Sequence, residues 1–194
     1  MKNVILNERQ VFFFELGRFV NQFSTSESLV FLFLADLLKM NKDECNAITS
    51  GAKIEVCCSY IKRVYEARST EIPNDVSQCL DQVSIINKLR NDLLHRGATS
   101  DFTVSNEVRA LPGRVESYKI DLQMLRNATQ DLSKITMTLN LVINPVDDIS
   151  PERERMKEVA NGPWRYKPPS PINNHQKNRG NHQAPKPPRE PSRG

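Results

Sequence analysis

Proline is distributed very unevenly along this chain of 194 residues. Ten of its 12 prolines lie after residue 144, and only Pro73 and Pro112 interrupt the chain before that point. Proline removes a backbone hydrogen-bond donor and breaks helices, so long helices are allowed before residue 144 and disfavoured after it. The distribution therefore divides the chain into a body, residues 1–144, and a tail, residues 145–194.

Charge divides the chain at the same place. The body carries 17 basic and 17 acidic side chains, whereas the tail carries 10 basic and 6 acidic ones, a net charge of +4. A neutral body argues against a broad basic surface that grips nucleic acid. We expect the body to form one domain. Residues 151–158 could form a loose helical turn; the rest of the tail has too little apolar area to offset the entropy of ordering, so we expect it to be disordered.

The sequence also indicates where the protein works. The first residues are charged where a signal peptide would be apolar, and the apolar run Leu29–Ala35 ends at Asp36, far short of the ~20 residues of a membrane span. The cysteines show no metal-type spacing; they are Cys45, Cys57, Cys58 and Cys79. We therefore expect a cytoplasmic protein with reduced cysteines, no membrane partner, no metal and no cofactor.

Apolar residues recur at helical spacing through the body, which predicts an all-α fold. The expected helices cover about residues 4–23, 24–40, 41–70 and 76–96, with a last one that starts between Ser117 and Asp121 and stops at Asn144. Ser24 and Glu27 fit a capping box that would start the second helix. The last helix has the most regular apolar stripe, and we expect this stripe to pack against the helix that carries Arg90. Its members are Leu122, Leu125, Ala128, Leu132, Ile135, Leu139 and Val142.

Residues 98–116 follow a different pattern. Phe102, Val104 and Val108 alternate with polar residues, and a turn sequence follows at residues 111–114. The pattern predicts a short hairpin or an extended arm between the last two helices.

The polar residues near the end of the fourth helix are the strongest candidates for chemistry. His95 is the only histidine of the body. On a helical wheel, Lys88, Asn91, Asp92 and His95 share one polar strip, whereas Arg90 lies about 140° from His95 on the apolar side. One helix therefore cannot bring Arg90 and His95 face to face. They converge only in a groove that wraps the helix, or where a second copy of the helix approaches.

A purely structural interpretation of these residues stays open. His and Arg in the last turn of a helix interact favourably with the helix dipole without any further function. Arg90, near the apolar side, could be a buried arginine that pairs with a carboxylate of another helix.

The segment Arg90-Asn91-Asp92-Leu93-Leu94-His95 also resembles the Arg-Asn-x-x-x-His signature of the HEPN domain family. The resemblance covers about residues 10–143. It implies an antiparallel bundle of four or five helices that forms a homodimer, with the two motifs facing each other across a cleft. Many members are metal-independent endoribonucleases, often in toxin or antiviral defence systems, whereas others are non-catalytic binding modules.

The chemistry of metal-independent RNA cleavage suits these residue types. It needs a base for the 2′-hydroxyl, an acid for the leaving oxygen and positive charge on the phosphorane. We expect His95 to exchange the protons, Arg90 to bind phosphate oxygens with its two parallel N–H donors, and Asn91 to hold the imidazole tautomer or a phosphate oxygen. Further residues are expected to line the cleft: Asp92, Arg96, Lys88, Glu27 and Ser28.

The alternative function is a non-catalytic helical module of the same type that binds a protein partner or a nucleotide. The tail adds a second candidate contact, because its Pro-x-x-Pro spacings fit the groove of a protein partner that recognises polyproline. RNA as substrate, a second copy of the chain and such a protein are thus the expected partners.

Overall fold

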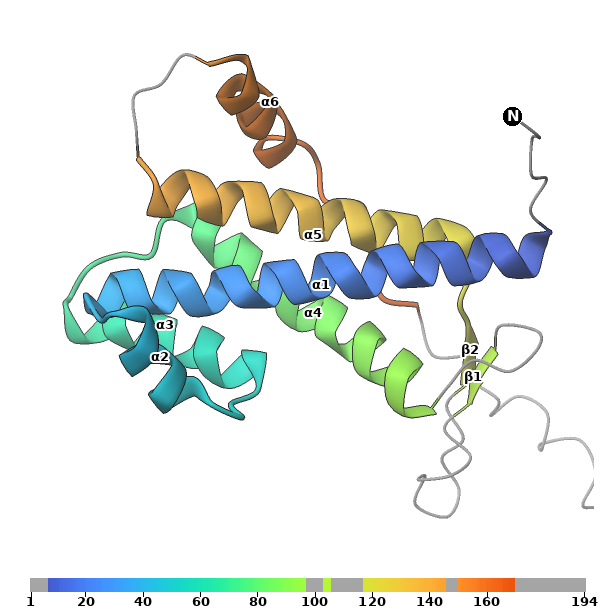
Figure 1. Ribbon diagram of the computed structural model, residues 1–194, viewed down its shortest axis with the longest axis horizontal. Helices are drawn as coiled ribbons and strands as arrows, with labels where there is room; N and C mark the ends of the chain where they lie inside the picture. Colours follow the sequence, from blue (N-terminus) through green and yellow to red (C-terminus); the bar gives the residue numbers. More distant parts are fainter. Residues whose placement is uncertain (1–6, 97–102, 106–116, 146–149, 170–194) are drawn as a thin grey trace, which may run out of the picture.

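The computed structural model describes residues 7–96, 103–105, 117–145 and 150–169. Within these residues the chain is all-α, and six helices pack as a bundle (Figure 1). The helices are α1 (Glu8–Leu38), α2 (Lys42–Thr49), α3 (Ile54–Ala67), α4 (Asn74–Arg96), α5 (Leu122–Ile143) and α6 (Pro151–Ala160). Two short strands, β1 (Thr103–Ser105) and β2 (Ser117–Lys119), pair antiparallel.

The core lies between α1, α4 and α5. Helices α1 and α5 run side by side, and α4 crosses beneath them (Figure 1). The predicted stripe of α5 is buried, since Leu125, Leu132 and Ile135 are fully inaccessible. From α1 the core takes Phe12, Phe19 and other residues at 3–4 residue steps. The prediction that this stripe packs against the helix that carries Arg90 is confirmed.

The first two predicted helices are one continuous helix, α1, so the predicted boundary at Ser24 is wrong. The capping box of α1 lies instead at Asn7 and Gln10. The hydroxyl of Ser24 donates to the carbonyl oxygen of Val20 at 3.1 Å, and that of Ser26 to Gln22 at 3.0 Å. Serine can satisfy its hydroxyl on the preceding turn of a helix, so a Ser-rich segment does not need to end one.

The third predicted helix is two helices, α2 and α3. Asn41 and Glu44 form the predicted capping box at the start of α2. The break falls between Thr49 and Ile54, where Gly51 has a φ of +72°. This left-handed conformation is easily reached only by glycine, and it turns the chain out of the helix.

The predicted hairpin is present in part. Strand β1 lies inside the predicted range 98–116, whereas β2 begins one residue after it. The predicted turn, residues 111–114, and Gly97, which we expected to end α4, lie outside the described residues.

The helical turn at residues 151–158 is present as part of α6, but the prediction that the rest of the tail is disordered is wrong for residues 159–169. Ser150 caps α6, and Pro151 occupies its first turn, where a missing N–H costs nothing. Helix α6 packs on α5 (Figure 1). The segment that follows, residues 162–169, is named the strap here; it inserts Tyr166 into the core, where only 5% of that residue is exposed. Residues 170–194 lie outside the described part of the chain.

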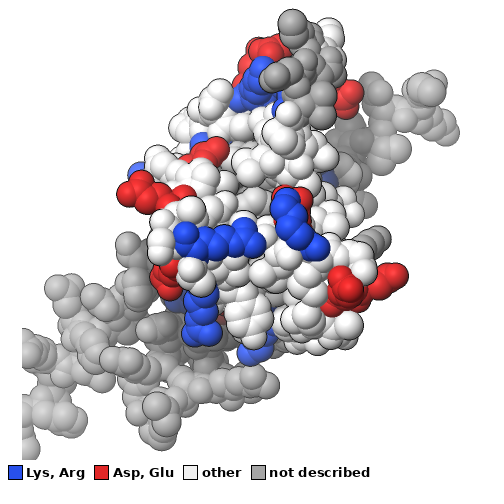
Figure 2. Space-filling view, turned by 90° about the vertical axis from the view of Figure 1, so that its left-hand side faces the viewer, with Lys and Arg blue, Asp and Glu red and all other residues white. Residues whose placement is uncertain are grey.

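At the end of the bundle where α1 finishes, the surface carries lysine and arginine side chains interspersed with acidic and uncharged ones (Figure 2). In the described residues, no helix is long and apolar enough to cross a membrane.

Candidate functional site

The Arg-Asn-x-x-x-His motif, residues 90–95, occupies the last two turns of α4. The backbone of residues 90–96 is helical, so the motif residues share one helix end as predicted. The side chains of His95 and Arg96 lie outside what the structure describes. The positions of the other motif residues can be compared with the prediction.

Arg90 lies against the core, as its place on the helical wheel predicts. Its guanidinium is half-buried and sits over the ring of Phe23 in α1, with 5.5 Å from Cζ to the ring centroid. Its Nη1 donates to Oδ1 of Asn91 at 3.0 Å. Within the part of the chain that the structure describes, no carboxylate forms an ion pair with Arg90. The structural alternative of a buried arginine neutralised by another helix is therefore not what these residues show.

The predicted polar strip holds for two of its members and fails for a third. Lys88 is exposed and Asn91 is half-buried, but Asp92 is only 4% exposed. The strap comes within electrostatic reach of Asp92. The charge of Asp92 reaches the phenol of Tyr166 and, after burial itself, is the second cause that raises the pKa of Tyr166 to about 12.

The carboxylate of Asp131 in α5 binds the backbone of the strap. Its Oδ1 accepts the backbone N–H of Arg165 at 2.9 Å, and its Oδ2 accepts that of Tyr166 at 2.8 Å. Gln82 of α4 donates through Nε2 to Oδ2 of Asp131 at 2.8 Å and to the carbonyl oxygen of Tyr166 at 3.1 Å. Burial raises the pKa of Asp131, although these N–H donors act in the opposite direction.

Trp164 fixes the strap at a second point. The indole Nε1 donates to Oε1 of Gln78 at 3.0 Å, and Nζ of Lys134 lies 4.1 Å from the centroid of the Trp164 ring. Lys134 also donates to the carbonyl oxygen of Gly162. The sequence analysis missed this site. The only available signal was an aromatic pair, Trp164 and Tyr166, in an otherwise polar tail.

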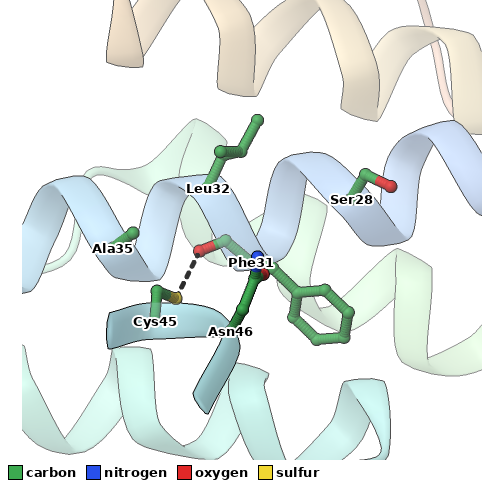
Figure 3. Close-up of a pocket in the computed structure, with 6 residues that line it drawn as sticks. All are labelled: Ser28, Phe31, Leu32, Ala35, Cys45 and Asn46. Carbon is green, nitrogen blue, oxygen red and sulfur yellow. Dashed lines mark hydrogen bonds between the residues drawn. The ribbon is translucent and has the colours of Figure 1, made fainter. Parts of the chain in front are cut away.

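The described contacts of the two cleft candidates on α1 are with residues of α1, α2 and α3. Ser28 lines a pocket of about 190 Å³ whose other lining residues also come from α1 and α2: Phe31, Leu32, Ala35, Cys45 and Asn46 (Figure 3). The hydroxyl of Ser28 donates to the carbonyl oxygen of Ser24. Glu27 is half-buried, and its charge acts on Cys57 of α3.

Cysteine chemistry is disfavoured in the described core. All four cysteines are free and buried. Burial raises the pKa of Cys57 and Cys79 to about 11 and that of Cys58 to about 12, so these thiols are protonated at neutral pH and weakly nucleophilic. Among the described residues, no group of three or more His, Cys, Asp and Glu is placed to hold a metal ion.

Comparison with known proteins leaves the family open. No protein-family model matches the chain, and no match was found among curated proteins or among solved structures. The fold therefore stands on the structure alone: in its described residues, the chain is an all-helical protein of six helices.

Proposed function

We propose that the protein is a metal-independent endoribonuclease of the HEPN type. The observation that carries this proposal is the setting of Arg90, a half-buried cation at the motif end of α4 that rests on an aromatic ring instead of pairing with a described carboxylate. A guanidinium that is held in place and that no described carboxylate neutralises is suited to binding two phosphate oxygens at once. The described helical bundle is compatible with the family that the motif resembles.

In the proposed reaction three residues have distinct roles. His95 takes the proton of the 2′-hydroxyl and returns a proton to the leaving 5′-oxygen. Arg90 stabilises the negative charge that develops on the phosphorane. Asn91, already bonded to Arg90, holds the guanidinium in its orientation.

A homodimer is part of the proposal, because the helical wheel separates positions 90 and 95 by about 140°. Two-fold symmetry would place the same helix end of each protomer in one cleft, so that Arg90 of one protomer and His95 of the other act on one phosphate. Neither side chain needs to leave its own helix face in this arrangement.

The test measures cleavage of single-stranded RNA in the presence of chelator. We expect His95→Ala and Arg90→Lys each to lower the rate by about 10²–10⁴-fold. The chain offers matched controls. His175→Ala removes a histidine of the tail, and Arg126→Lys changes an arginine that also precedes an asparagine but pairs with Glu15. Both controls should keep the wild-type rate.

Mixing inactive variants tests the composite site. If the working site takes Arg from one protomer and His from the other, a mixture of Arg90→Ala and His95→Ala proteins contains heterodimers with one intact site. Partial recovery of cleavage is the expected result. Unchanged cleavage by His95→Ala would contradict the proposal. A wild type that binds RNA without cleaving it would favour the non-catalytic module.

A further inference from the structure

Side chains of two neighbouring helices hold the strap. Two of them come from α4 and two from α5: Gln78, Gln82, Asp131 and Lys134. These four side chains are named the slot here. All of them precede their strap partners in the chain by at least 28 positions, and none comes from α6. The slot is therefore formed by the helical body, and the strap occupies it as a separate segment.

The slot recognises an extended main chain and two aromatic side chains. Both backbone groups of Tyr166 are bound, since its N–H donates to Asp131 and its carbonyl oxygen accepts from Gln82. The side chain of Tyr166 is buried, and the indole N–H of Trp164 donates to Gln78. These contacts fit an extended segment with the sequence Trp-x-Tyr, which occurs once in the chain, at residues 164–166.

Helix α6 connects the strap to the body without a buried residue of its own. Near its start, Arg153 donates to the carbonyl oxygen of Asn144 at the end of α5, at 3.0 Å. Beyond its end, the carbonyl oxygen of Gly162 accepts from Lys134, almost three turns earlier in α5. Helix α6 therefore folds back along α5 as the second half of a helical hairpin.

The contacts of the strap allow it to leave the slot without unfolding the body. Tyr166 is the one buried residue of the described segment 150–169. The other contacts are mainly hydrogen bonds, which contribute little net stability where water replaces them after release. Segments held in this way open locally at a lower free energy than that of global unfolding. An open strap and an empty slot are therefore accessible states of the folded protein.

We propose that the slot is a peptide-binding site that accepts the Trp-x-Tyr strap of a second copy of the chain as well as its own. Exchange between two copies keeps every contact of the strap and changes only the path of the chain between α5 and α6. The strap of the same chain has an effective concentration of about millimolar through its short tether, so exchange is favoured where copies are concentrated. The proposal uses no residue of the motif and does not rest on the proposed function.

Trp164 makes the exchange measurable, because it is the only tryptophan of the chain. A first full-length variant, Trp164→Leu with Tyr166→Ala, keeps the slot but has no strap aromatics and no tryptophan emission. A second full-length variant, Gln78→Ala with Asp131→Ala, keeps the strap but lacks the acceptors of its N–H groups. Neither variant can dock its own strap, so binding between the two chains has no competitor within either chain.

The experiment titrates the second variant with the first and records tryptophan fluorescence. Alone, the second variant should emit at longer wavelength than wild type, because its indole is in water. The first variant should shift the emission back to the wild-type wavelength, with saturation at one slot per strap. The matched control is a chain with all four replacements, which has neither slot nor strap aromatics and should cause no shift.

Helical circular dichroism verifies that each variant is folded. If loss of Asp131 unfolds the second variant, Lys134→Glu takes its place, because a carboxylate there repels the carbonyl oxygen of Gly162 and removes the cation from the Trp164 ring. An unshifted emission on mixing would overturn the proposal and restrict the slot to the strap of its own chain. An equal shift with the control would overturn it too, as would wild-type emission from the second variant alone.

The result is independent of the proposed function. Both variants keep Arg90, Asn91 and His95, and the fluorescence readout needs no RNA. Loss of cleavage in His95→Ala leaves the exchange of straps unaffected. An absent exchange leaves the catalytic proposal as it stands.

Discussion

At the scale of single residues, Asp131 anchors the strap, a role that its sequence context does not indicate. In the sequence it follows Arg126-Asn127 at the place where a motif histidine would stand. In the structure it is a buried acceptor for backbone N–H groups 34 and 35 residues away. Nothing local in the sequence encodes a contact of this range, which is why the sequence analysis assigned Asp131 no role.

Replacing Asp131 with Ala is expected to destabilise the protein. The change leaves the N–H groups of Arg165 and Tyr166 without their acceptor, and unsatisfied buried donors cost about 1–3 kcal/mol. Urea denaturation measures the difference in the free energy of unfolding. Asp81→Ala is the matched control, because Asp81 is exposed and forms only a surface ion pair with Lys62, for which less than about 1 kcal/mol is expected. Equal effects of the two changes would contradict the anchoring role.

Tyr166 makes the docking of the strap sensitive to alkaline pH. Its pKa of about 12 in the folded protein exceeds the ordinary value of 10.0, chiefly because of burial and secondarily because of Asp92. The folded state thus keeps the phenol proton to higher pH than the unfolded state does. The stability that depends on this proton is complete below pH 10 and is lost as the pH rises from 10 to 12.

The pH effect can be isolated with Tyr166→Phe, which has no phenol proton to lose. At 1.36 kcal/mol per pH unit, wild type should lose up to about 2–3 kcal/mol more than the variant between pH 10 and 12. Urea denaturation at several pH values measures both curves, and ionisation of the buried thiols affects both proteins alike. Parallel curves would show that the phenol is not buried in solution.

At the scale of helices and strands, the sequence was informative where periodicity was regular and misleading where local signals competed. The α5 stripe has seven members at 3–4 residue steps, so its helix and its buried face could both be predicted. Ser24 and Glu27 also satisfy a capping pattern, but α1 continues through them for another three turns. The apolar face of α1 decides the outcome, because burial of Phe19, Phe23 and Val30 against one core requires a single straight helix.

Replacing the serines of α1 tests whether α1 is one continuous helix, because the expected change in stability differs between an N-cap and a helix interior. At an N-cap, Ser→Ala costs about 0.5–2 kcal/mol. Exposed Ser24 lies inside the helix, where alanine is the better helix former, so Ser24→Ala should be neutral or stabilise by a few tenths of a kcal/mol. Ser26→Ala should instead destabilise by about 1 kcal/mol, because its buried hydroxyl also bonds to the carbonyl oxygen of Leu132 in α5. Thermal or urea denaturation of the two variants decides between the two helix boundaries.

At the scale of the whole molecule, the candidate site could be predicted only in the part that depends on one helix. The wheel placed Arg90 near the core and the motif at one helix end, and both follow from α4 alone. It placed Asp92 in a solvated strip, which is wrong: Asp92 is only 4% exposed, and its charge acts on Tyr166, a residue more than 70 positions later in the chain. Helical periodicity describes the faces of an element, but not which distant segment will cover them.

Truncation tests whether the strap contributes to the stability of the folded protein. Ending the chain after residue 149 removes α6, uncovers the face of α4 and α5 that Tyr166 fills, and leaves Asp131 without its backbone donors. Burial of one large side chain contributes about 1.5–3 kcal/mol, and the lost hydrogen bonds add to it, so at least about 3 kcal/mol should be lost. For a chain of this size that loss lowers Tm by roughly 6–12 °C.

Ending the chain after Pro169 should leave Tm within about a degree of wild type. The hydrogen bonds that Asp131, Gln82 and Gln78 form with the strap all involve residues up to Tyr166, so this truncation keeps them. Scanning calorimetry of the two truncated proteins and wild type gives the comparison directly. A protein ending at residue 149 that melts like wild type would mean that the strap is not docked in solution.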